Sequence, residues 1–240
     1  MHKTLERRLV LSAAAAGLLF ASVGGVFAAS PLKLEFVTHA AFFSAETKQP
    51  KVLDPQVFVD EHQMGSEGPR MFIPPFADPV GLRVPPIMAR TVNVIGTRIA
   101  QELDQNGMPG AVSQLETYDA WYPGYIDYMP MYQNINAWWT ETQGGNCATP
   151  RTTTLDSLPR AYKELRPTSL YTSPWAEGKW GLRDAVNYMV VADLATLNYA
   201  ARFKTELLYN RYQSARNTIQ QFRTSAPSPA IPTPTWCCTH

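Results

Sequence analysis

The residues best suited to acid–base or metal chemistry stand in the stretch VDEHQMGSEG, where His62 directly follows Asp60 and Glu61. The β-branched and aromatic residues at 57–59 favour a strand, and the turn formers at 65–68 end it, so we expect His62 where the strand stops. Chemical groups are often mounted at strand ends. A histidine there either binds a metal ion or serves as a hydrogen-bonded surface residue, and the pattern leaves both open.

A second candidate group is Glu141, in the stretch INAWWTETQGG. The apolar approach at 135–139 predicts a strand that delivers the carboxylate into an aromatic pocket, where burial raises the pKa toward that of a general base. An exposed glutamate at a strand end is the alternative. Aromatic residues are dense from Tyr118 to Trp139, and they either line a binding cleft or pack a core.

Other catalytic chemistries lack their motifs. The sequence contains no G-x-S-x-G, H-E-x-x-H, His-x-x-Glu or G-x-G-x-x-G, which disfavours serine hydrolases and dinucleotide enzymes. Histidine is scarce: besides His62, the chain has His2, His39 and His240. The cysteines are an odd set without disulfide spacing, so unpaired thiols are favoured and one pairing with Cys147 stays open. They are Cys147, Cys237 and Cys238.

Composition and charge favour one ordinary globular domain. The 240 residues are 45% hydrophobic and 17% charged, which suffices to bury a core. The net charge is +1, and Lys and Arg do not cluster beyond the first eight residues. Such a chain has no electrostatic footprint for nucleic acid, so we expect no nucleic-acid partner.

The N-terminus resembles an export signal. A basic start with Lys3, Arg7 and Arg8 precedes the apolar stretch 9–27, which ends in small residues before a cleavage site after Ala28. Residues 1–28 are therefore predicted to be a signal peptide, and the mature protein to be secreted or periplasmic without a stable membrane anchor. A retained membrane anchor is the alternative, because the stretch is nearly long enough to span.

The mature chain alternates short strand signals with two long helical patterns. The expected elements are, in chain order, an irregular lead-in at 29–54, strands at 56–59 and 71–73, a helix at 85–105, strands and loops at 111–150, an extended connection at 151–181, a helix at 183–218 and a disordered Pro-rich tail at 220–240. The first helix has an apolar stripe of Met88, Val92, Ile95, Ile99 and Leu103. The second is expected to face the core with Val186, Val190, Leu194, Leu197, Ala201, Leu208 and Tyr212.

Three features together resemble the zinc carboxypeptidase (metallocarboxypeptidase) family, in its secreted bacterial branch. They are the segment PQVFVDEHQMGSEGPRMFIPPFADP, the segment WWTETQGGN and the long terminal helix, and they cover residues 55–219. The resemblance implies an α/β fold, here a partial three-layer mixed sheet flanked by helices with one long C-terminal helix. It also implies a zinc cofactor and a hydrolase that cleaves at peptide or protein C-termini.

The resemblance assigns roles to individual residues. His62 is implied to be the third zinc ligand, and Glu141 the base that deprotonates a bound water and then protonates the leaving amine. An aromatic hydroxyl is implied in the loop before the Glu141 strand, for which Tyr122 is the nearest candidate and Tyr118 a rival.

The chain also departs from the family pattern. The family's first two zinc ligands form a His-x-x-Glu pair that this sequence lacks, and no arginine stands between Arg8 and Arg70 to hold a substrate carboxylate. We therefore expect weak zinc binding, impaired hydrolysis and a truncated sheet whose open edge allows self-association. The alternative function is a non-catalytic peptide-binding or structural module that uses the aromatic cleft Tyr118–Trp139, and a gene fragment without function is a third reading.

Overall fold

The computed structural model describes residues 55–65, 68–115, 118–144 and 149–224. They belong to one compact unit that begins at Pro55. The predictions of a signal peptide and a lead-in, and those on the three cysteines, concern residues outside these ranges. Of the expected tail, the first five residues are helical and the rest also lies outside the described residues.

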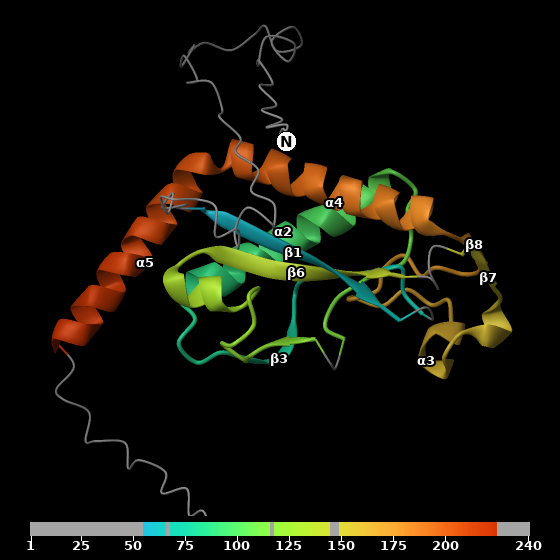
Figure 1. Cartoon of the computed structure of the whole chain (residues 1–240), viewed down its shortest axis with the longest axis horizontal. Coiled ribbons are helices and arrows are strands. Elements are labelled where there is room, and N and C mark those ends of the chain that lie inside the picture. Colours follow the sequence, from blue (N-terminus) through green and yellow to red (C-terminus); the bar gives the residue numbers. More distant parts are fainter. Residues whose placement is uncertain (1–54, 66–67, 116–117, 145–148, 225–240) are drawn as a thin grey trace, which may run out of the picture. The chain divides into compact units, whose positions relative to one another are not determined.

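A four-stranded mixed sheet organises the unit (Figure 1). Its strands, in spatial order, are β1 (Val57–Met64), β6 (Asn136–Gln143), β2 (Met71–Phe72) and β4 (Ala111–Val112). β1 runs parallel to β6, β2 runs antiparallel to β6, and β4 runs parallel to β2. A mixed sheet combined with long helices confirms the α/β class.

Short elements connect the main strands. They are β3 (Ala77–Val80), which pairs with β5 (Asp119–Ala120), β7 (Arg151–Thr153), which pairs with β8 (Gly178–Trp180), the 3-10 turns η2 (Met129–Gln133) and η4 (Leu155–Ser157), and α3 (Arg160–Lys163). The expected extended connection at 151–181 thus contains short strands and turns rather than one extended run.

The first long helix, α2 (Pro86–Gln105), follows its sequence signals closely. Proline suits the first turn, where the backbone N–H has no intrahelical partner. Gly107 adopts a left-handed φ of +65° just after the helix, which ends it. The predicted apolar stripe is confirmed, because all five of its members are buried.

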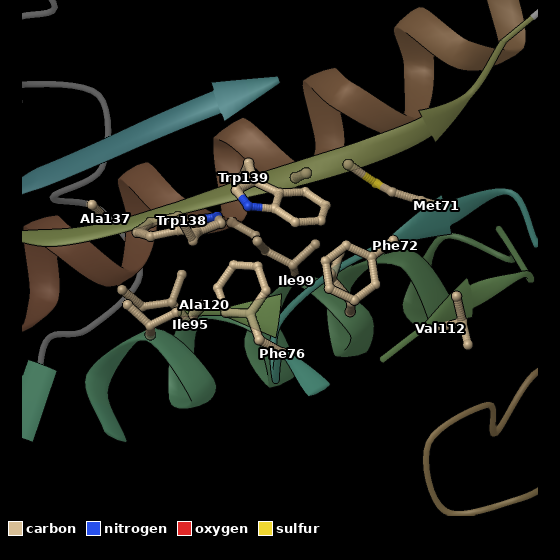
Figure 2. Packing of buried hydrophobic residues seen from close by; sticks show 14 of the residues in the cluster. Met71, Phe72, Phe76, Ile95, Ile99, Val112, Ala120, Ala137, Trp138 and Trp139 are labelled. Carbon is tan, nitrogen blue, oxygen red and sulfur yellow. The ribbon is translucent and has the colours of Figure 1, made fainter. Parts of the chain in front are cut away.

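The strand β6 forms the centre of the core. Trp138 and Trp139 are both buried, and as neighbours in a strand they point to opposite faces of the sheet. The Trp139 ring lies 4.9 Å from that of Phe72 and 5.2 Å from that of Phe76 (Figure 2). A strand buried on both faces is fixed in place by packing from both sides.

The long C-terminal helix is present but is divided at Phe203 into α4 (Leu182–Arg202) and α5 (Lys204–Thr224). The predicted core stripe is wrong. Val186, Val190 and Leu194 are 42%, 48% and 59% exposed, and Leu208 and Tyr212 of α5 are exposed as well. The buried face of α4 consists mainly of Ala185, Tyr188, Ala192, Ala195, Thr196 and Tyr199. Its alanines allow close packing against α2 and β6, so the branched residues face outward.

None of the described helices is long and apolar enough to cross a membrane.

A buried arginine ties the end of β6 to the segment before α4. Arg70 is fully buried, and its guanidinium lies 3.7 Å from the Trp175 ring centre and 5.0 Å from that of Trp180. It donates hydrogen bonds to Gln143 Oε1 at 2.8 Å and to the Gly68 carbonyl at 2.5 Å. Burial lowers the pKa of Arg70 to about 10, so the group stays charged at neutral pH and is held by ring faces and neutral oxygens.

Two glycines test how tightly this arginine is packed. A Cβ at Gly110, where φ is +101°, would lie 2.7 Å from Arg70 Cγ, whereas a Cβ at Gly107 meets nothing within 4 Å. We expect Gly107→Ala to lower the free energy of unfolding by about 1–2 kcal/mol through backbone strain alone. Gly110→Ala adds overpacking and is expected to cost about 3 kcal/mol or more in urea unfolding. Equal losses would contradict the close packing.

The open edge of β1 provides a test of self-association. The Asn136 amide donates a hydrogen bond to the Gln56 carbonyl, and the Gly144 amide donates one to the Met64 carbonyl. The even-numbered residues of β1 therefore direct their backbone N–H and C=O groups toward β6. The odd-numbered residues of β1, Val59 among them, direct their backbone groups to the other side, where no described strand pairs with β1. Such edges pair with other chains.

We expect Val59→Pro to reduce self-association in light scattering, because it removes an N–H at the middle of the open edge without breaking the bonds to β6. Val59→Thr keeps the N–H and the branched shape, and it should associate as the wild type does. An unchanged mass for Val59→Pro, where the wild type associates, rules out the edge as the contact.

Candidate functional site

The structure brings together the two site residues that the sequence reasoning favoured. In the parallel register of β1 and β6, His62 is the direct cross-strand neighbour of Glu141. Paired residues project from the same face of a sheet. His62 Nδ1 lies 3.8 Å from Glu141 Oε1. We expected His62 where the strand stops, but β1 continues to Met64, so His62 lies within the strand. The backbone hydrogen bonds between β1 and β6 therefore hold its position.

A second carboxylate orients the imidazole from the other side. His62 Nε2 lies 3.0 Å from Asp60 Oδ2, so the ring donates its Nε2–H to that oxygen. Residues two apart in a strand share a face, which places Asp60 beside His62. The Trp139 ring lies 6.1 Å from the imidazole and forms an apolar wall. Asp127, which is almost fully buried, adds a further negative charge.

These neighbours shift the proton affinities of the pair. Burial lowers the pKa of His62, but the hydrogen bond and charge of Asp60, with the charges of Glu141 and Asp127, raise it further, so the net shift is upward. Burial also raises the pKa of Glu141, and the nearby His62 only partly offsets this. A carboxylic acid of raised pKa beside an imidazole is an arrangement suited to proton transfer.

The two tyrosine candidates lie in different surroundings. The Tyr118 ring packs edge-on against Trp139 at 4.7 Å, and burial, with the charge of Glu141, raises the pKa of Tyr118 to about 12. Tyr122 is half exposed, and its ring contacts are with Trp121 and Tyr125. Of the two, it is therefore the rival, Tyr118, that lies close to Glu141.

The described residues do not by themselves fit a zinc ion. Catalytic zinc takes three protein ligands and an open position. In the described part of the chain, no group of three His, Cys, Asp or Glu side chains is placed to hold a metal ion. Both nitrogens of the His62 ring face carboxylates. The Asp60 contact nevertheless has the form in which carboxylates orient metal-binding imidazoles in other proteins.

Asp60 and Asp127 are site residues whose roles the sequence reasoning missed. The role of Asp60 could have been predicted from the sequence, because alternate residues of a strand share a face of the sheet. Asp127 lies between the half-exposed Tyr125 and the turn η2, where no periodic pattern signals which side chains point inward.

Comparison with known proteins gave no match to a family model, to a curated protein or to a solved structure.

The acid–base pair predicts a measurable shift in the titration of His62. A folded-state pKa above the usual value of about 6.5 means that protonated His62 stabilises the fold below that pH, and that this contribution is lost as pH rises through the folded pKa. Asp60→Asn removes the hydrogen-bonded charge. We expect it to lower the His62 pKa in an NMR titration of the ring protons.

Asp104→Asn, an exposed carboxylate in the last turn of α2, is the matched control and should leave the titration unchanged. An equal shift in both variants would mean that overall charge, rather than the contact with Asp60, sets the proton affinity of His62.

Proposed function

We propose that the chain is a secreted relative of the zinc carboxypeptidases, and that His62 and Glu141 are its part of a site that hydrolyses peptides at their C-termini. The supporting observation is the in-register pairing of His62 with Glu141 on the parallel strands β1 and β6. The resemblance named these two residues from separate segments, and their direct juxtaposition is what a shared catalytic role requires.

Each residue has a distinct role in this proposal. Glu141 accepts a proton from the attacking water and returns it to the leaving amine, for which its raised pKa suits it. Asp60 holds the imidazole of His62 in one orientation, with Nδ1 toward Glu141. The Tyr118 phenol keeps its proton at neutral pH and serves as a hydrogen-bond donor beside Glu141. Tyr122 lies farther out, on the exposed aromatic surface.

Zinc is the cofactor that the resemblance implies, and it supplies water activation in such enzymes. Because the described residues do not complete a zinc site, at least two further ligands must come from outside them. The sequence also lacks the His-x-x-Glu pair of that family, so we propose that this chain alone binds zinc weakly and hydrolyses peptides poorly.

Zinc analysis and peptide hydrolysis test the proposal together. We expect the purified protein to hold much less than stoichiometric zinc by elemental analysis, and His62→Ala to remove what is bound. With zinc in excess, slow release of C-terminal residues is expected, and Glu141→Gln should reduce it by about 10²–10⁴-fold while leaving zinc binding intact. Glu164→Gln, an exposed carboxylate after α3, should have no effect. Hydrolysis unaffected by Glu141→Gln would overturn the proposed role.

A second candidate function is peptide binding without catalysis. Trp121, Tyr122 and Tyr125 are all about half exposed, and their rings form a chain of contacts that continues through Tyr128 to Trp139 beside His62. Exposed aromatic rings of this kind often bind peptides. In the same assays, binding that survives EDTA and Glu141→Gln but not Tyr125→Ala supports this function over hydrolysis.

A further inference from the structure

The outward face of α4 carries a row of apolar side chains. α2 and β6 pack against the opposite face of this helix, which contains its buried alanines (Figure 1). The row is formed by Leu182, Val186, Val190 and Leu194, whose exposed fractions range from 42% to 59%. Residues four apart form a ridge along a helix, and helices pack against each other by such ridges. A contiguous apolar surface of this kind marks a contact site.

The spacing of this row is symmetric about the level of Tyr188. Leu182 and Leu194 stand six residues before and after Tyr188, and Val186 and Val190 stand two residues before and after it. Two copies of α4 can pack antiparallel about a two-fold axis at this level. Residues at equal distances before and after Tyr188 then lie opposite each other. In such a pair, leucine meets leucine and valine meets valine along the whole row.

Two charged residues beside the row follow the same symmetry with opposite signs. Arg183 stands five residues before Tyr188, and Asp193 stands five residues after it. Each lies three residues from a valine of the row, so both flank the row on the helix surface. Both are exposed, and neither forms a salt bridge with another described residue. The antiparallel pair places Arg183 of each copy opposite Asp193 of the other.

These charges select both the partner and its orientation. Parallel helices would place Arg183 against Arg183 and Asp193 against Asp193, and like charges in direct contact disfavour that arrangement. The row alone fits many apolar surfaces. A second α4 also presents the opposite charge at each matching position, so the face is complementary to itself.

We propose that the mature protein forms a dimer through α4, in which the two helices pack antiparallel along the row and Arg183 of each copy pairs with Asp193 of the other. The contact covers residues 182–194, about 20 Å of helix, so it lies at the low end of interface sizes. Its Kd is expected to be about 10 µM. The contact includes neither His62 nor Glu141, so it does not rest on the proposed hydrolysis.

Sedimentation equilibrium of the full-length mature protein, at concentrations on either side of the expected Kd, tests the apolar contact. Val190→Glu brings a carboxylate from each copy against Val186 of the other, and it is expected to raise the Kd about 100-fold. Val94→Glu is the matched control, because Val94 is also a half-exposed valine but lies on α2. It should dimerise as the wild type does.

Charge reversal tests the pairing itself. Arg183→Glu and Asp193→Arg each place like charges opposite one another at both ends of the contact, and each is expected to raise the Kd about 10-fold. An equimolar mixture of these two variants forms a dimer in which both pairs are again of opposite charge. The mixture should therefore dimerise about as tightly as the wild type. Loss of apolar surface or of stability would not be repaired by mixing.

Three results would overturn the proposal. The first is a monomer at every concentration, as expected if another segment of this chain covers the face. The second is a Kd unchanged in Val190→Glu. The third is an association that Val59→Pro removes and Val190→Glu does not, which assigns the contact to the edge of β1. If circular dichroism shows that Val190→Glu is unfolded, the two charge variants and their mixture decide, and a mixture no tighter than either variant counts against the dimer.

Discussion

The parallel pairing of β1 with β6 is the constraint on which the candidate site depends. It places His62 beside Glu141 on one face and Gln63 beside Thr142 on the other. Because side chains alternate along a strand, a slip of one residue would exchange the two faces and separate both pairs. Under the proposed function, the contact between His62 and Glu141 therefore depends on this register.

Packing around β6 holds that register in place. Trp138 and Trp139 fill the core on the two faces of the strand, and truncating a buried aromatic residue typically costs about 3–5 kcal/mol. At the carboxyl end, Arg70 holds Gln143 by a hydrogen bond and stacks on Trp180, whose indole N–H donates to the Gln143 carbonyl. The end of β6, two residues beyond Glu141, is thus fixed by direct bonds as well as by the hydrophobic core.

The sequence predicted those parts of the fold that local patterns determine. The stripe of α2 was predictable because one face of the helix is apolar and its ends carry proline and glycine. The stripe of α4 was not, because both faces of that helix are apolar and periodicity cannot tell which one is buried. Ala185 and Ala192 are buried because small residues allow close helix contact, which only the tertiary structure reveals.

The candidate site shows the same division. His62 and Glu141 stood out by residue type, but their contact depends on a pairing between distant segments that no local pattern encodes. Strands as short as β2 and β4 are defined by their neighbours rather than by propensity, which tertiary packing overrides.

The position of β1 bears on how the proposed site around His62 could be completed. β1 is an edge strand of the described sheet, and its odd-numbered residues direct their backbone groups to the unpaired side. A further strand bound there would lie about 4.8 Å away and would place every second side chain beside Asp60 and His62. Under the proposed function, and because His62 is already oriented by Asp60 and backed by Trp139, such a strand could supply further ligands without rearranging His62. If the proposed function holds, completion of the site and closure of the sheet edge would be the same event.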